Sequence, residues 1–146
     1  MIPIMVLNGP NLGRLGAREP EVYGHVSHEE LAQTVVAWGR ELGFAVEVFQ
    51  SDAEPELIAL LHQAAEQGRA VIINPAAFSH YSYALRDAAA QADPVVEVHL
   101  TNPASRESFR HHSVISGVVK GTIAGFGLDS YRLALHAINQ ILTASR

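Results

Sequence analysis

The chain contains no cysteine and only one lysine, and each shortage argues against a kind of chemistry. Without cysteine there is no disulfide, no thiolate nucleophile and no cysteine-based zinc site. The single lysine, Lys120, lies in the apolar stretch 118–123, which we interpret as a strand. Imine catalysis needs a lysine that loses its proton in a desolvated pocket, so this position disfavours it.

Long apolar runs and concentrated positive charge are missing as well. No run approaches the ~20 residues of a membrane-spanning helix, and residues 1–7 lack the charged and apolar regions of a signal peptide. The net charge is −5, from 10 Lys and Arg against 15 Asp and Glu, and the basic residues are scattered. This disfavours nucleic acid as a partner. We expect a cytoplasmic protein.

The histidines do not form a metal-binding pattern. There are 8 of them, but His111 and His112 are adjacent and point apart on most backbones. His62 and His136 lie in helical stretches with no carboxylate cluster nearby. We therefore predict no metal site.

One long loop separates the first apolar run from the first helical pattern. Residues 8–24 contain four glycines and two prolines, which should prevent regular helix or sheet. The loop also carries apolar and charged side chains, unlike a polar linker. We predict that it folds over the domain and brings polar groups to a site.

Strand-like and helix-like patterns alternate along the rest of the chain. Its 146 residues suit one catalytic domain, 1–146, with a real core. The apolar runs predict strands over Ile2–Asn8, Phe44–Gln50, Ala70–Asn74, Val95–Leu100 and Val118–Ala124. Helices are predicted from Ser27 to Gly43, and over Glu54–Gln67, Tyr81–Ala92 and Ser130–Thr143. Asn102–His112 is predicted as a loop with a short helical piece.

This alternation predicts a parallel sheet covered by helices on both faces. Among five-stranded, doubly wound α/β sheets, the flavodoxin-like strand order 2-1-3-4-5 is the leading choice. It places strands one, three and four side by side. The loops that leave their carboxyl ends then form one rim, which is where such sheets bind ligands.

Polar side chains collect on that predicted rim. They are Asn11, Arg18, Glu19 and Tyr23 after strand one, Asn74 and His80 after strand three with Asp87 behind, and His99, Thr101, Arg106 and Arg110 at and after strand four. Polar groups at the tips of buried strands are out of place unless they face a cleft. We interpret them as one site.

The rim does not match the common nucleotide or phosphate sites. The glycine loop has no lysine for a P-loop and no G-x-G-x-x-G fingerprint. A phosphate-accepting receiver would have aspartate where this chain has Asn74, and a flavin loop would be rich in hydroxyls. What remains is acid–base chemistry on an anionic small molecule.

The residue types on the rim suit that chemistry. Arginine binds both oxygens of a carboxylate through its planar fork. Tyrosine is a poor base, only about 0.1% ionised at pH 7, but a guanidinium within ~4–6 Å favours the phenolate. Arg18 is five residues before Tyr23, so this partnership is sterically easy, and His99 can serve as the complementary acid.

With these residues identified, the chain strongly resembles the type II 3-dehydroquinate dehydratases. The matching segments are NGPNLGRLGAREPEVYG at 8–24, INPAAFSHYSYALRDA at 73–88, VEVHLTNPASRESFRHHS at 96–113 and GTIAGFGLDSYRLAL at 121–135. The resemblance implies cofactor-free anti-elimination of water from 3-dehydroquinate, through an enolate, giving 3-dehydroshikimate in the shikimate pathway. It also implies a homo-dodecamer, a tetramer of trimers. It leaves open whether the role is biosynthesis or quinate breakdown.

The resemblance also implies roles for individual residues. Tyr23 would be the base that removes a C2 proton, Arg18 would keep it ionised and stabilise the transition state, and His99 would protonate the departing C1 hydroxyl. Asn11 would hold a water at the enolate oxygen, and Glu19 would help set His99 and Arg18. The remaining residues would bind or orient the substrate: Asn74, His80, Asp87, the backbone of Leu100 and Thr101, Arg106 from a mobile loop, and Arg110.

Ala76 departs from the family pattern, because it replaces a glycine that is common there. We expect a less tightly turned loop after strand three.

Two other functions stay open. One is a flavodoxin-like binding or signalling module without catalysis, and the other is a non-catalytic subunit that kept the fold. The presence of Arg18, Tyr23 and His99 counts against the second. A hydrolase lacks support because there is neither a thiol nor a G-x-S-x-G motif.

Overall fold

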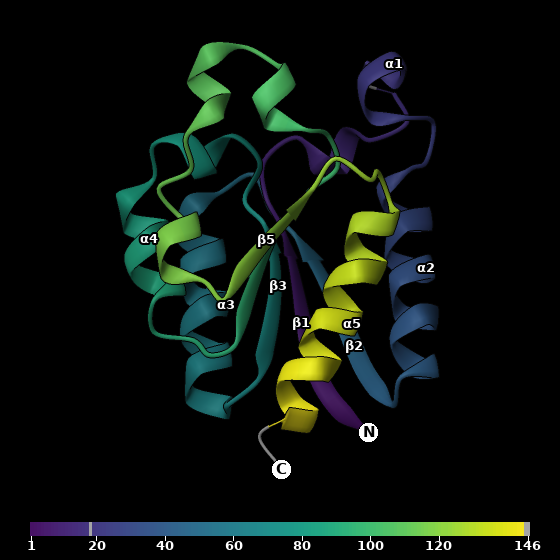
Figure 1. Cartoon of the computed structure of the whole chain (residues 1–146), viewed down its shortest axis with the longest axis vertical. Helices are drawn as coiled ribbons and strands as arrows, with labels where there is room; N and C mark the ends of the chain where they lie inside the picture. The colour runs from purple at the N-terminus through teal and green to yellow at the C-terminus, as the bar shows by residue number, and fades with distance from the viewer. Residues whose placement is uncertain (18, 145–146) are drawn as a thin grey trace.

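A five-stranded parallel sheet runs through the centre of the protein, with helices on both faces (Figure 1). The computed structural model describes residues 1–17 and 19–144, and of Tyr23 only the backbone. The strands are β1 Ile2–Asn8, β2 Phe44–Gln50, β3 Ala70–Asn74, β4 Val95–His99 and β5 Gly121–Ala124. Their order is β2-β1-β3-β4-β5, so the predicted flavodoxin-like order is confirmed.

Helices α2 and α5 cover one face of the sheet, and α3 and α4 cover the other (Figure 1). The helices are α1 Pro20–Tyr23, α2 His28–Glu41, α3 Glu54–Gln67, α4 Tyr83–Ala89 and α5 Asp129–Ala144. Short 3-10 turns are η1 Leu12–Arg14, η2 Ala76–His80, η3 Pro103–Ser105, η4 Ser108–His111 and η5 Ser116–Val118. Within the described residues, no helix is both long and apolar enough to cross a membrane.

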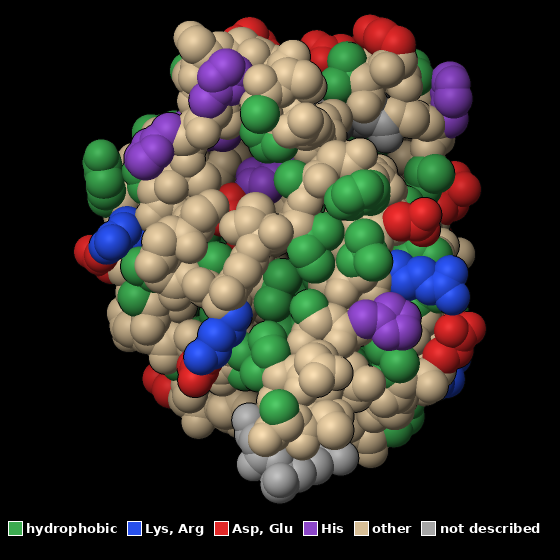
Figure 2. All heavy atoms as spheres, in the orientation of Figure 1, with side chains coloured by type: hydrophobic (Ala, Val, Ile, Leu, Met, Phe, Trp, Pro, Cys, Tyr) green, Lys and Arg blue, Asp and Glu red, His purple; other side chains and the backbone are tan. Residues whose placement is uncertain are grey.

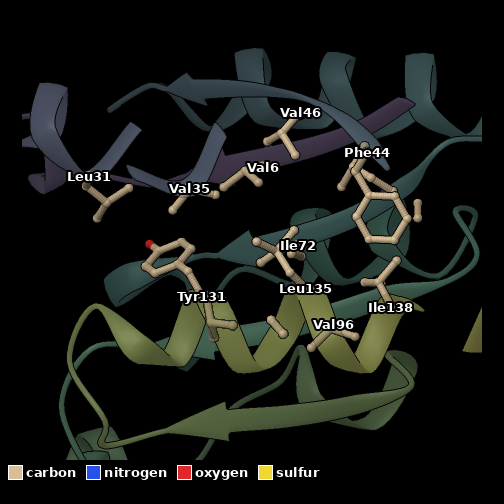
Figure 3. Close-up of a cluster of buried hydrophobic side chains, with 14 of the residues drawn as sticks. Val6, Leu31, Val35, Phe44, Val46, Ile72, Val96, Tyr131, Leu135 and Ile138 are labelled. Atoms are coloured by element: carbon tan, nitrogen blue, oxygen red, sulfur yellow. The ribbon is translucent and has the colours of Figure 1, made fainter. Parts of the chain in front are cut away.

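The continuous apolar run of β1 is explained by burial on both faces. Ile4 and Val6 pack in the cluster under α2 and α5, whereas Met5 and Leu7 pack in the cluster under α3 and α4. All four are fully buried. Successive side chains of a strand point to opposite faces, so a strand between two helix layers needs apolar residues at every position. Figure 3 shows the first of these clusters, with Val6 and Ile72 facing the side chains of α5.

The first helix begins as its sequence predicts. Ser27 caps α2, because its Oγ accepts a hydrogen bond from the backbone N–H of Glu30 at 3.1 Å. The Ser27 hydroxyl also donates to the Glu30 side chain at 3.1 Å. These are contacts of a capping box.

Two predicted elements are longer than those in the structure. The strand predicted over 118–124 begins only at Gly121, because the N–H of Val118 bonds to Ile115 O in a turn. Val118 still packs against the core, so its apolar character reports burial rather than strand pairing. The helix predicted over 81–92 is the shorter α4, Tyr83–Ala89, which begins after its cap Ser82, whose Oγ accepts from Leu85 N at 3.0 Å, and ends three residues before Ala92.

The loop 8–24 is less irregular than its glycines and prolines predict. It contains the single turns η1 and α1. Asn11 and Glu19 precede these turns with left-handed φ values of 70° and 40°, and Pro20 occupies the first position of α1. Proline fits a first helical turn because its missing N–H has no partner to lose there. The prediction that the loop holds no helix was therefore wrong.

Ala76 keeps the tight turn that a glycine would favour. Its φ is 51°, in the left-handed region that costs a residue with a Cβ roughly 1–2 kcal/mol. Its N–H donates to Asn74 Oδ1 at 3.1 Å. The expectation of a looser turn after β3 was therefore wrong.

The chain leaves β1 directly against the end of β3. Gly9 N donates to Asn74 O at 2.8 Å, and a Cβ built on Gly9 would lie only 2.7 Å from the backbone oxygen of Pro75. Neither backbone can yield without losing sheet or turn hydrogen bonds. Position 9 therefore requires glycine.

Replacing Gly9 with alanine should lower the free energy of unfolding by about 1–3 kcal/mol, because the methyl group overpacks a fixed backbone. Urea denaturation followed by circular dichroism measures this loss. Gly117→Ala is the matched control, because an added Cβ there meets nothing within 4 Å. Equal stability of the two variants would contradict the proposed clash.

Candidate active site

A polar cleft of about 190 Å³ lies at the carboxyl ends of the strands. Eight residues predicted from the sequence line it: Asn11, Asn74, His80, His99, Leu100, Thr101, Arg106 and Arg110. They lie at the ends of β3 and β4 and in the loops after β1, β3 and β4, which are neighbours in the sheet. The loops that contribute them lie at the upper end of Figure 1, and Figure 2 shows histidine side chains concentrated in the upper half of the same face.

His99 ends β4 and is held by a buried carboxylate. Its Nε2 lies 2.5 Å from Oε2 of Glu97, whose side chain is fully buried. The two residues are two apart in one strand, so their side chains leave the same face. Because an ionised carboxylate only accepts hydrogen bonds, Nε2 of His99 carries hydrogen. Nδ1 is then the ring nitrogen left for other partners.

Both carboxylate oxygens of Glu97 accept hydrogen bonds. Ser116 Oγ donates to Oε1 at 2.6 Å, and Ser113 Oγ donates to Oε2 at 3.0 Å. Burial raises the pKa of Glu97, but hydrogen bonds from His99, Ser116 and Ser113, with the attraction of a charged His99, bring it below the ordinary value. Glu97 is thus a stable buried anion beside His99.

Two arginines approach the cleft from the segment after β4. Arg106 Nη1 donates to Thr101 Oγ1 at 3.2 Å, and Arg110 Nε donates to Glu107 Oε1 at 2.9 Å. The guanidinium of Arg110 also lies over the Phe109 ring, 4.6 Å from its centroid. Arg106 and Arg110 are mostly buried, so they offer positive charge in a partly desolvated place.

The end of β3 and the loops after β1 and β3 add further polar groups. Asn74 is buried and fixed by its bond from Ala76 N. His80 Nδ1 lies 2.8 Å from the carbonyl oxygen of His112, so Nδ1 carries the hydrogen and Nε2 is left over. The backbone N–H of Asn11 donates to Asp52 at 2.9 Å, which anchors its turn.

Two of the predicted site residues that the structure describes do not line this cleft. Asp87 lies on the exposed side of α4, with Oδ1 3.8 Å from Arg86 Nη1. Glu19 is exposed and does not line the cleft, so the buried partner of His99 is Glu97 instead. Arg18 and the side chain of Tyr23 lie outside the described residues.

Glu97 is the main residue that sequence reasoning missed. A signal was present, because Val95–Leu100 was predicted as a strand of a sheet with helices on both faces, and a carboxylate buried in such a sheet needs a partner. Side chains two residues apart in a strand leave the same face, so His99 is the partner expected for Glu97. The serines that complete the arrangement, Ser113 and Ser116, carried no signal because they follow a loop whose path is not readable from sequence.

The fold and the cleft together define a flavodoxin-like α/β protein with a polar, arginine-bearing site at the carboxyl edge of its sheet. A family model described as Dehydroquinase class II matches residues 2–139. A 3-dehydroquinate dehydratase from Salinispora tropica is 58% identical over 134 residues, 91% of this chain and 94% of that protein. One from Thermus thermophilus is 53% identical, covering 90% of each chain.

Solved structures agree with these sequence matches. The type II dehydroquinase from Propionibacterium acnes is 53% identical and superposes with a TM-score of 0.94, covering 96% of this chain and 97% of that one. The type II dehydroquinase from Butyrivibrio crossotus is 40% identical with a TM-score of 0.92, covering 94% and 97%. The chain belongs to the class II dehydroquinase family.

Proposed function

We infer that the chain is a hydro-lyase that removes water from 3-dehydroquinate to give 3-dehydroshikimate, in the shikimate pathway. One observation carries this proposal beyond family membership. In a single cleft, a histidine backed by a buried carboxylate lies with two arginines that can hold an organic acid. The single domain 1–146 would carry the whole reaction.

His99 is the general acid in this proposal. With Nε2 committed to Glu97, its Nδ1 is the atom that would donate a proton to the departing C1 hydroxyl. The buried charge of Glu97 supports the protonated ring before transfer and keeps it oriented afterwards. Glu97 thus acts through His99. We therefore propose that Glu97, and not Glu19 as the resemblance implied, orients His99.

Tyr23 is the proposed base and Arg18 its activator. Removal of the C2 proton by a phenolate gives an enolate, and a guanidinium near the phenolate stabilises both that anion and the developing negative charge. Asn11 lines the cleft and would hold the water at the enolate oxygen. The resemblance of loop 8–24 to the family segment supports these roles.

The carboxylate of the substrate would be held by the segment after β4. Arg110 and Arg106 supply charge-assisted hydrogen bonds, and the backbone of Leu100 and Thr101 supplies neutral ones. Glu107 now bonds Arg110, so a substrate carboxylate would compete with it for that guanidinium.

Asn74 and His80 line the same cleft and would orient the substrate hydroxyls. Asp87 is exposed on α4, so a part in the site would need a contact from outside this chain's own cleft. We propose a homo-oligomer, a dodecamer built of trimers, located in the cytoplasm. The reaction as proposed uses no cofactor and no metal, because tyrosine, histidine and arginine supply its acid, base and charge.

The dehydratase activity is tested by adding 3-dehydroquinate to metal-free protein and following ultraviolet absorbance. Formation of 3-dehydroshikimate creates a conjugated enone, so absorbance should rise in proportion to enzyme concentration. Absence of a signal at high enzyme concentration would overturn the function. In that case flavin binding and phosphate acceptance would be the next assays, for a flavodoxin-like module.

A further inference from the structure

A chain of buried hydrogen bonds lies behind the cleft and reaches Asn74 from α5. Tyr131 donates its hydroxyl hydrogen to Asn8 Oδ1 at 2.7 Å and accepts from Asn74 Nδ2 at 3.0 Å. Asn8 Nδ2 in turn lies 3.0 Å from His28 Nε2. Asn8 and Asn74 are paired in register at the ends of β1 and β3, so the Tyr131 hydroxyl bridges the two strand tips.

One backbone group determines which atom donates and which accepts in each of these hydrogen bonds. Ala76 N–H can only donate, and it lies 3.1 Å from Asn74 Oδ1, so Nδ2 of Asn74 faces Tyr131. The Tyr131 oxygen must then accept from Asn74, which sends its own hydrogen to Asn8. Asn8 Nδ2 is left to donate to His28, whose Nε2 must be unprotonated. Burial lowers the pKa of His28, which favours that neutral ring.

Tyr131 is fully shielded from solvent. The residue is fully buried, and its ring lies between α5 and the strands, next to Val35 and Leu135 (Figure 3). Burial raises the pKa of Tyr131 far above that of a free tyrosine, although the bond from Asn74 opposes the rise. The hydroxyl therefore stays neutral and both donates and accepts, which an ionised phenolate could not do.

Holding Asn74 in this way defines what the cleft offers to a ligand. One Nδ2 hydrogen is used by Tyr131, so the second is the amide hydrogen that a ligand in the cleft can meet. Without the Tyr131 hydroxyl, the amide would lose a partner in a buried place and could rotate.

We propose that Tyr131 is a positioning residue for substrate binding: its hydroxyl, braced by Asn8, fixes the side-chain amide of Asn74 in the orientation that recognises the substrate. This proposal rests on the dehydratase function inferred above. It assigns to α5, which contributes no side chain to the cleft, an influence on affinity that is exerted through Asn74.

The test is Tyr131→Phe, which keeps the buried ring and removes only the hydroxyl. KM for 3-dehydroquinate should rise about tenfold, the effect of losing one well-placed hydrogen bond, while kcat changes by less than about twofold. In the Asn74→Ala background the same substitution should leave KM nearly unchanged, because the side chain through which Tyr131 acts is already gone. Ile138→Val is the matched control, a buried change on the same helix that makes no hydrogen bond. It should reduce thermal stability without changing KM.

Three results would separate the possible failures. If Tyr131→Phe keeps the wild-type KM, or if its effect adds fully to that of Asn74→Ala, Tyr131 is structural only and the proposal is wrong. If the wild-type protein has no dehydratase activity, the proposed function fails instead. A crystal structure of Tyr131→Phe then decides the positioning separately, since a rotated Asn74 amide supports it and an unmoved amide overturns it.

Discussion

Replacing Tyr23 with phenylalanine should lower kcat by roughly 10²–10⁴-fold, the range that a positioned acid or base contributes. The substitution keeps the ring and removes the hydroxyl oxygen, the one atom of a tyrosine side chain that can accept the C2 proton. Substrate binding should survive, because the groups proposed to hold the carboxylate, Arg106 and Arg110, belong to a different segment. Initial rates from the enone absorbance give kcat, and isothermal titration of 3-dehydroquinate gives Kd.

Tyr83→Phe is the matched control for this experiment. Tyr83 is 69% exposed at the start of α4 and does not line the cleft, so its hydroxyl should be dispensable for turnover. If Tyr23→Phe retains near-normal kcat, the base has been assigned to the wrong residue. The same loss of rate in both variants would also contradict a specific role for Tyr23.

Replacing Glu97 with glutamine should lower kcat about 10–100-fold, by analogy with the loss of a carboxylate that orients a metal-binding histidine. Glutamine has nearly the same volume, but only one of its two terminal atoms accepts hydrogen bonds. It cannot satisfy His99, Ser113 and Ser116 together as the carboxylate does. The negative charge that stabilises protonated His99 is lost as well.

Glu47→Gln is the corresponding control, because Glu47 is an exposed strand carboxylate whose partner is Arg69, away from the cleft. Its kcat should match the wild type. Wild-type activity of Glu97→Gln would show that the His99–Glu97 contact does not matter for the reaction.

The lowered pKa of Glu97 also predicts how the stability difference between wild type and Glu97→Gln depends on pH. A carboxyl whose folded pKa lies below its unfolded value stabilises the fold above about pH 4.3, and that contribution disappears as pH falls through the folded pKa. The wild type should therefore lose its advantage in acid. Urea denaturation at neutral pH and near pH 3 measures this, and a constant difference would contradict it.

The strand order and the location of the site were predictable because both depend on short-range patterns. Apolar runs such as Ile2–Asn8 report strands buried on two faces, and helix signals such as Ser27 and Glu30 report a cap. Once the order is known, side chains that follow β1, β3 and β4 must meet at one edge. The cleft accordingly contains Asn74 and His99 together.

The sequence patterns did not reveal contacts between residues that the fold brings together from distant parts of the chain. Glu97 lies only two residues from His99, so that pairing had a local signal, but its other contacts, Ser113 and Ser116, are 16 and 19 residues further along the chain and had none. Val118 was predicted as strand because apolar character records burial and not the hydrogen-bond partner.

By itself, then, the amino-acid sequence determined the alternation of strands and helices and the edge of the sheet that carries the cleft, and it supplied the residue types proposed to act there as acid, base and anion-binding groups. These are local properties, set by side-chain polarity and periodicity. Only the tertiary structure decided which atoms act together: that His99 is committed through Nε2 to Glu97, and that Tyr131, 57 residues beyond Asn74, bonds its amide. The physical reason is that a hydrogen bond depends on distance and direction within a few tenths of an ångström, and those are set when distant segments pack.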